Sequence, residues 1–205
     1  KIGNINIKLY VFKIVDIPGS GSLEAAQSTM PDGLWWIKDR ENTTDHLLID
    51  SINGKDDALK CPTGTRGHSY SDPSGKTVIW GWKAGGTWVS NLDGSSPSIV
   101  NANTANGFSI VKYVGNQTAG HTIGHGLNSA PEMIMLKCLD SVNPFYVYHK
   151  GVDASNPSHY NLRLNGSDAR QDSTTEFNDT EPTSSVFTLG TTTGTNKTDN
   201  EYIAY

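Results

Sequence analysis

Residues 31–38 read PDGLWWIK, and residues 131–137 read PEMIMLK. Each stretch begins at a proline, runs through apolar residues and ends at a lysine, Lys38 or Lys137, and these lysines are 99 positions apart. Short apolar runs bounded by Pro, Gly or Asp are typical of β-strands. The two stretches therefore predict one β unit that occurs twice in the chain.

Segments on both sides of these stretches repeat at similar distances. At the offset of 99, residues 11–15 (VFKIV) align with residues 110–114 (IVKYV), and residues 46–50 (HLLID) align with residues 145–149 (FYVYH). Order and residue character agree across most of the chain, although chance similarity among β segments is the alternative. Two further alignments follow a longer spacing: Leu59-Lys60 with Leu162-Arg163, and residues 77–80 (TVIW) with residues 202–205 (YIAY).

The repeat divides the chain into a first β module over residues 1–86, a connector over residues 87–106 and a second β module over residues 107–205. The connector is rich in Gly, Ser and Asn, which favour turns and flexible links. Trp88-Val89 and Ile99-Val100 are apolar enough to form short strands within it.

The expected fold class is all-β, with antiparallel strands in two related β-sandwich-like modules that arose by internal duplication. With 21 glycines among 205 residues, the composition favours short strands joined by many turns. One short helix is expected over Ser22–Met30. The expected strands are Ile7–Val15, Leu34–Lys38, His46–Ile52, Thr77–Lys83, Phe108–Val114, Glu132–Lys137, Phe145–Lys150, Tyr160–Leu164, Ser185–Leu189 and Tyr202–Tyr205.

Alternation along the strands predicts where the tryptophans point. Trp35 and Trp36 are adjacent, so they face opposite sides of their strand, and one of them needs a second covering surface or lies exposed. Trp80 and Trp82 share a face, and Gly81 between them leaves the opposite face open to close backbone approach.

Charge and hydropathy exclude several classes of protein. The net charge of −5 with no basic patch argues against a nucleic-acid partner. No apolar run approaches the roughly 20 residues of a membrane span, and Lys1–Asp16 lacks the order of a signal peptide. Cys61 and Cys138 align with different parts of the repeat, so we expect two free thiols.

The histidines and the oxygen-rich segment of this sequence are interpreted as structural, and not as catalytic or metal-binding. His121 and His125 lie among glycines, and in a strand their side chains stand about 13 Å apart, too far to share a metal. His46 and His149 adjoin matched strand positions. The Thr-, Ser- and Asn-rich run at 172–198 offers oxygen ligands for Ca²⁺ but lacks the EF-hand order.

Hydrolysis of a glycan needs two carboxylates about 5–10 Å apart. No spacing singles out a pair among Asp39, Asp50, Glu132 and Glu176, and Asp56-Asp57 is loop-like. The sequence also lacks a serine nucleophile elbow and a phosphate loop. We therefore expect no enzyme activity, no catalytic residues, no cofactor and no metal site.

Exposed aromatic side chains are the one lead toward a ligand, because sugars stack on such rings. Those that would serve if exposed are Trp35, Trp36, Trp88, Tyr146 and Tyr160, although burial in a core is the more usual place for an aromatic side chain. The ligand-binding residues themselves stay unknown at this level.

Several of these segments resemble a repeated module in large structural proteins of tailed phages, especially phages of marine bacteria and cyanobacteria. Such proteins are described as tail fibres or virion-associated proteins. The segments that carry the resemblance are residues 31–40, 46–54 and 80–86 (WGWKAGG) in the first unit and 107–113 (GFSIVKY), 122–127, 130–131, 147–151 and 182–190 (PTSSVFTLG) in the second. Residues 1–29 match less well, and Gly81 stands where the family favours a small residue and often Cys.

The resemblance implies a virion location, most readily the tail of a cyanophage-like particle. It implies a tail fibre or spike component for host attachment, whose partners are other virion proteins, a host-surface glycan or protein and further copies of the chain, as a trimer. The alternatives are a capsid decoration protein, a polysaccharide-degrading tail enzyme and a secreted adhesin.

Overall fold

The computed structural model describes residues 17–18, 22–61, 63–64, 66–71 and 76–205. The strand expected over Ile7–Val15 lies outside these residues, and so does the first member of the alignment between residues 11–15 and 110–114. The described residues form antiparallel sheets with short helices, so the expected all-β class is confirmed.

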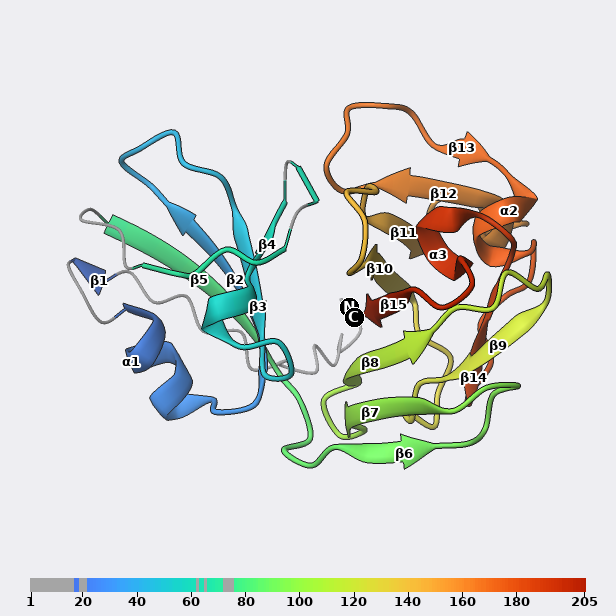
Figure 1. The fold of residues 1–205 in the computed structure, drawn as a ribbon, viewed down its shortest axis with the longest axis horizontal. Helices are drawn as coiled ribbons and strands as arrows, with labels where there is room; N and C mark the ends of the chain where they lie inside the picture. Colours follow the sequence, from blue (N-terminus) through green and yellow to red (C-terminus); the bar gives the residue numbers. More distant parts are fainter. Residues whose placement is uncertain (1–16, 19–21, 62, 65, 72–75) are drawn as a thin grey trace, which may run out of the picture.

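Two sheets contain most of the strands in the described residues. The first has five strands in the order β1-β5-β2-β3-β4, and the second has eight in the order β13-β12-β11-β10-β15-β8-β7-β6 (Figure 1). The strands of the first sheet are β1 (Ile17–Pro18), β2 (Gly33–Asp39), β3 (Leu47–Asp50), β4 (Leu59–Lys60) and β5 (Lys76–Lys83). Those of the second are β6 (Val89–Asn91), β7 (Ser98–Asn103), β8 (Phe108–Val114), β10 (Met133–Cys138), β11 (Tyr146–His149), β12 (Tyr160–Arg163), β13 (Gln171–Asp172) and β15 (Glu201–Ala204).

The remaining elements cover the outer faces of these sheets. A two-stranded sheet pairs β9 (His121–Gly124) with β14 (Val186–Leu189). The helices are α1 (Ser22–Thr29), α2 (Thr174–Phe177) and α3 (Thr193–Asn196), with 3-10 turns η1 (Lys55–Asp57) and η2 (Pro157–His159). None of the helices in the described part of the chain is long and apolar enough to span a bilayer.

Three buried clusters hold the layers together. The first joins α1 to the outer face of the five-stranded sheet through Leu23, Met30 and Trp35. The second fills the space between the two large sheets. The third joins the far face of the eight-stranded sheet to the β9–β14 pair and to Phe177 of α2. The molecule is therefore a sandwich of two sheets with a further layer on each outside face (Figure 1).

The two large sheets share a common pairing scheme. The order β5-β2-β3-β4 in the first corresponds to β15-β10-β11-β12 in the second, and all of these neighbours pair antiparallel. The register agrees residue by residue with the alignment of the sequence. Equivalent pairs are Trp36↔Leu48 and Met135↔Val147, Leu48↔Leu59 and Val147↔Leu162, and Ile37↔Ile79 and Leu136↔Ala204.

The two aligned lysines have the same structural role. The Lys38 ammonium group donates hydrogen bonds to the backbone carbonyls of Asp39, Asn42 and Thr44, in the loop between β2 and β3. Lys137 donates to the carbonyls of Cys138 and Ser141, in the loop between β10 and β11. In both loops the lysine therefore satisfies carbonyls one and four residues ahead, which fixes the turn that joins the two strands.

Equivalent faces of the two sheets pack against each other. Leu48 and its counterpart Val147 lie in the shared central cluster, whereas Ile37 and its counterpart Leu136 lie in the two outer clusters. The sandwich thus forms between the two units, with one sheet from each. The origin of this correspondence by duplication stays a prediction.

Residues 87–106 contribute β6 and β7 to the eight-stranded sheet, at the positions where Trp88-Val89 and Ile99-Val100 were expected to form short strands. The chain passes from the first sheet to the second through residues 84–88, between β5 and β6. The division into two modules stays a prediction, because the central cluster takes residues from both.

The predicted helix is confirmed, whereas the close approach at Gly81 is made by a side chain and not by backbone. Helix α1 packs on the five-stranded sheet with Met30, just after its end, lying over Gly81 of β5. A Cβ atom at residue 81 would overlap Met30 Cε. Glycine therefore lets the end of the helix approach the strand closely.

Candidate functional site

A cleft of about 580 Å³ opens between the two large sheets. Trp36 and Trp82 of the five-stranded sheet line one wall, and Phe108, Met135 and Tyr205 of the eight-stranded sheet line the other. Ligand sites in proteins have similar volumes and a mostly apolar lining. This cleft is the candidate binding site of the chain.

Strand alternation places the tryptophans in the cleft. Trp35 points toward α1 and is buried, whereas its neighbour Trp36 points toward the second sheet and is half-buried. Trp82 is paired with Leu34 and faces the same side as Trp36. One of the two adjacent tryptophans was expected to need a second covering surface. That tryptophan is Trp36, and the opposing sheet covers it.

Trp36 is held in a fixed orientation. Its indole Nε1–H donates to His46 Nδ1 at 2.9 Å, and its ring meets the edges of the His46 and Trp80 rings. Burial, with a smaller effect of Lys38, lowers the pKa of His46, so the imidazole stays neutral and can accept this hydrogen bond. His46 thus positions an aromatic wall of the cleft.

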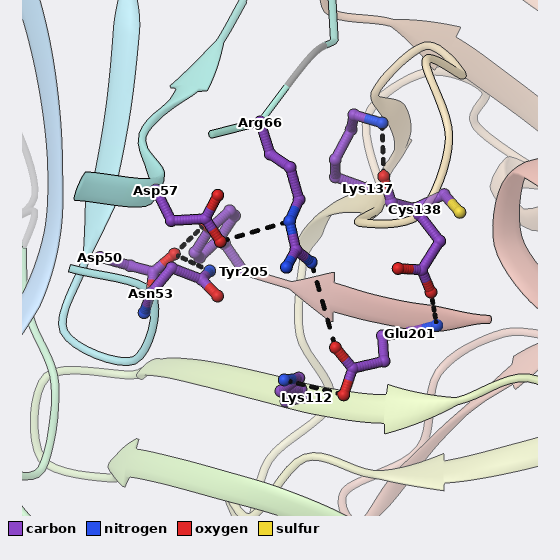
Figure 2. Close-up of polar contacts among 10 residues, drawn as sticks. Asp50, Asn53, Asp57, Arg66, Lys112, Lys137, Cys138, Glu201 and Tyr205 are labelled. Carbon is purple, nitrogen blue, oxygen red and sulfur yellow. Dashed lines mark hydrogen bonds and ion pairs between the residues drawn. The ribbon is translucent and has the colours of Figure 1, made fainter. Parts of the chain in front are cut away.

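The back of the cleft is closed by a hydrogen bond between the sheets. The Tyr205 hydroxyl donates to Asp50 Oδ2 at 2.6 Å (Figure 2). Asp50 is fully buried and also accepts from the backbone N–H groups of Ile52 and Asn53 and from the Asn53 side chain, each at 2.9 Å. Every oxygen of this buried carboxyl group therefore has a donor.

Polar groups near the floor and rim of the cleft already have partners. His125 is buried, accepts from the Leu127 N–H at Nδ1 and donates from Nε2 to the Thr183 carbonyl. Burial lowers its pKa, which favours this neutral tautomer. On the exposed rim, Glu132 forms an ion pair with Lys150 at 3.1 Å.

A chain of charges crosses the seam between the sheets. Asp57 contacts Arg66, Arg66 lies 4.0 Å from Glu201, and Glu201 accepts from Lys112 at 2.9 Å (Figure 2). These groups are all partly exposed, so each pair contributes at most about 1 kcal/mol. The network links β8 and β15 to the loop that follows β4, and it fixes alignment more than it adds stability.

A model of a family described as a domain of unknown function, DUF7483, matches residues 60–205. The chain belongs to the DUF7483 family. Neither the curated proteins nor the solved structures contain a match.

The DUF7483 match begins inside β4 and covers the whole eight-stranded sheet, together with β5. All of the residues that line the cleft fall within the matched segment except Trp36. Asp50, which closes the back of the cleft, also precedes the match. The site of this DUF7483 chain is therefore completed by the β2–β3 hairpin of the first unit.

The structure places the other aromatic candidates away from the cleft. Trp88 is half-buried against the central cluster, Tyr146 is buried, and Tyr160 lies beneath the Arg170 guanidinium at 4.1 Å. Of the five aromatic residues that the sequence singled out, Trp36 alone lines the cleft.

The carboxylate candidates are dispersed. Asp39 lies at the end of β2, where a side-chain hydrogen bond from Asn42 and backbone hydrogen bonds lower its pKa. Asp50 pairs with Leu34 at the other end of this hairpin, about 17 Å along the strand. Glu132 lies on the cleft rim, and Glu176 is buried in α2.

The remaining candidates have structural partners or lie outside the cleft. His121 is buried with its Nδ1 at 3.0 Å from Asn196 Oδ1, Cys61 and Cys138 are buried free thiols, and the run at 172–198 forms α2, β14 and α3. Within the part of the chain that the structure describes, no group of three or more His, Cys, Asp and Glu is placed to hold a metal ion.

Sequence reasoning missed Phe108, Met135 and the cleft role of Trp82. The signal for Trp82 was present, because Trp80 and Trp82 share a face that must lie opposite α1 once Gly81 contacts the helix. Nothing in the sequence indicated that a second sheet would lie opposite these side chains.

Replacing Tyr205 by Phe removes the hydroxyl that bonds to Asp50 and leaves a buried carboxyl oxygen with one donor fewer. We expect the free energy of unfolding in urea to fall by about 1–3 kcal/mol. Tyr160→Phe, on strand β12 at the surface, is the matched control and should change stability by less than about 0.5 kcal/mol. Equal effects of the two substitutions would contradict the role given to the hydrogen bond.

Alkaline pH should unfold the protein cooperatively. Burial raises the pKa of Tyr113, Tyr146, Tyr148, Tyr202 and Tyr205 above the ordinary value of about 10. Above that pH the unfolded chain releases these protons while the folded chain keeps them, so stability is lost as the pH rises further. Tyrosinate absorbance of these residues should appear together with the loss of the circular dichroism signal. Their ionisation near pH 10 in a chain that stays folded would contradict this.

Proposed function

We propose that this protein is a structural component of a tailed-bacteriophage particle, a tail fibre or spike part that contacts the host surface. The resemblance of both units to repeated modules of phage virion proteins supports the proposal. A rigid antiparallel sandwich that presents loops and a cleft is also suited to such a role, because binding residues are commonly carried on a stable β scaffold.

The observation that carries the attachment role is the aromatic cleft. Trp36, Trp82 and Phe108 present half-buried rings on its two walls, and His46 fixes the orientation of one of them. Flat aromatic faces in an open cleft are suited to stacking against the rings of a surface glycan. Ser109 and Ser129, which also line the cleft, offer hydroxyl groups to such a ligand.

The lining favours binding over hydrolysis. Among the described residues that line the cleft, Glu132 carries the one carboxyl group, and it is paired with Lys150. Cleavage of a glycosidic bond needs a second carboxylate across the bond. A polysaccharide-degrading role therefore has less support than a binding role.

Imaging can distinguish a position in the tail from the alternative, a position on the capsid surface. Antibodies against this chain, viewed by electron microscopy on intact particles from the lysate, should label the tail or its tip. Label confined to the head would replace the tail assignment with the capsid one, and unlabelled particles would overturn the virion proposal.

Trp82→Ala should weaken attachment, because it removes one aromatic wall of the cleft. We expect the labelled protein to bind host cells at least about tenfold more weakly, the loss of one stacked ring. Tyr160→Ala, which also removes a half-buried ring but away from the cleft, is the matched control and should bind as the native chain does. Thermal unfolding of both variants establishes that they fold. Unchanged binding of a folded Trp82→Ala protein would remove the cleft from the proposal.

A further inference from the structure

The eight-stranded sheet carries an exposed apolar strip on the face that points toward the first sheet. Leu92 is 73% exposed, Ile99 is 48% exposed and Val114 is 49% exposed. Ile99 and Val114 share this face, because Ile110, Lys112 and Val114 lie on the same side of β8 and Lys112 pairs with Ile99. Ser90 pairs with Ile99 and so lies on this face too, and Leu92 follows two residues later, directly after the end of β6.

This strip continues an interface that the chain already uses. On the same face, Ile110, Ile203 and Tyr205 are buried in the central cluster against the first sheet. Strands β6 and β7 extend past this contact, to the far edge of the sheet (Figure 1). Beyond this contact, Leu92, Ile99 and Val114 lie exposed, whereas Trp88 still packs against the central cluster.

Strand β6 ends the eight-stranded sheet at that edge. Of the strands in the described residues, only β7 pairs with it. Edge strands of soluble proteins are usually protected by a charge, a proline or a bulge. Residues 88–92 read WVSNL and contain neither a charged residue nor a proline.

We propose that two copies of this chain associate by antiparallel pairing of their β6 strands about a two-fold axis at Ser90. In this register, Trp88 of each copy lies opposite Leu92 of the other, on the face that carries the strip. Aromatic and aliphatic side chains opposite each other on neighbouring strands stabilise a sheet. The pairing provides hydrogen-bond partners for the backbone groups on the open edge of β6, and it also covers Leu92.

A second copy fits this surface better than a charged partner does. Asp93, the charged residue next to Leu92, accepts a hydrogen bond from the Asn91 side chain at 2.9 Å, and Lys112 and Glu201 are paired with each other at 2.9 Å. Isologous pairing of one strand with itself closes at two chains. The contact therefore makes dimers, whereas the resemblance suggests trimers, and it is independent of the phage assignment.

Light scattering of the full chain after size-exclusion chromatography should give twice the mass of 22.2 kDa at micromolar concentration. Leu92→Glu places a charge opposite Trp88 of the second copy and should raise the dissociation constant at least about tenfold. Val142→Glu is the matched control, because Val142 is 69% exposed on the β10–β11 loop, away from β6. A monomeric native chain, or a dimer that Leu92→Glu leaves unchanged, would overturn the proposal.

A cysteine at the axis tests the register. Ser90→Cys brings two thiols into directly opposed positions, about 4.5–5.5 Å apart at Cβ, close to the spacing of a disulfide. The native Cys61 and Cys138 are buried, so they contribute little background. Mild oxidation should crosslink most of the Ser90→Cys chains into covalent dimers, and several-fold fewer chains of the Val142→Cys control. Equal crosslinking of the two variants would reject the pairing about Ser90.

Discussion

The packing of two corresponding sheet faces against each other is the constraint on which the rest of this structure depends. Each sheet presents the same positions of its central hairpin to the other: Leu48 from one and Val147 from the other, Trp36 from one and Met135 from the other. At one end of this contact the correspondence is looser, because Leu34 is buried whereas its counterpart Met133 is 44% exposed. The hydrogen bond from Tyr205 to Asp50 lies within this contact and joins the last residue of one sheet to the central hairpin of the other.

The same constraint creates the cleft. Trp36 and Trp82 of the five-stranded sheet and Met133 and Met135 of the eight-stranded sheet line the cleft, beside the loop at 125–132. Elsewhere in the contact between the sheets, Leu34, Phe145 and Ile203 are fully buried. The candidate cleft and the buried central cluster are thus neighbouring parts of one interface. Substitutions that loosen the core will also alter the cleft.

The two outer faces differ, and this difference separates the units. Helix α1 covers the first sheet, whereas the β9–β14 pair and α2 cover the second. The insertion between β12 and β15 supplies most of that second cover, including Asn196, whose side chain donates to the carbonyls of Thr118 and Gly190 and accepts from the Asn116 N–H. The common hairpins therefore provide the frame, and the unequal insertions provide different covers for its two outer faces.

The sequence by itself determined most of the described strands, their short lengths, the α1 helix and the alignment of the two units, but not β9 or β13. Local patterns carry that information, because alternation and turn residues act over a few positions. It also determined that Trp35 and Trp36 would face opposite sides of their strand and that Trp80 and Trp82 would share a face. The tertiary structure alone decided that the two sheets face each other, that β6 and β7 join the second sheet, and that Tyr205 reaches Asp50. These depend on contacts between residues up to 155 positions apart, for which the local sequence holds no signal.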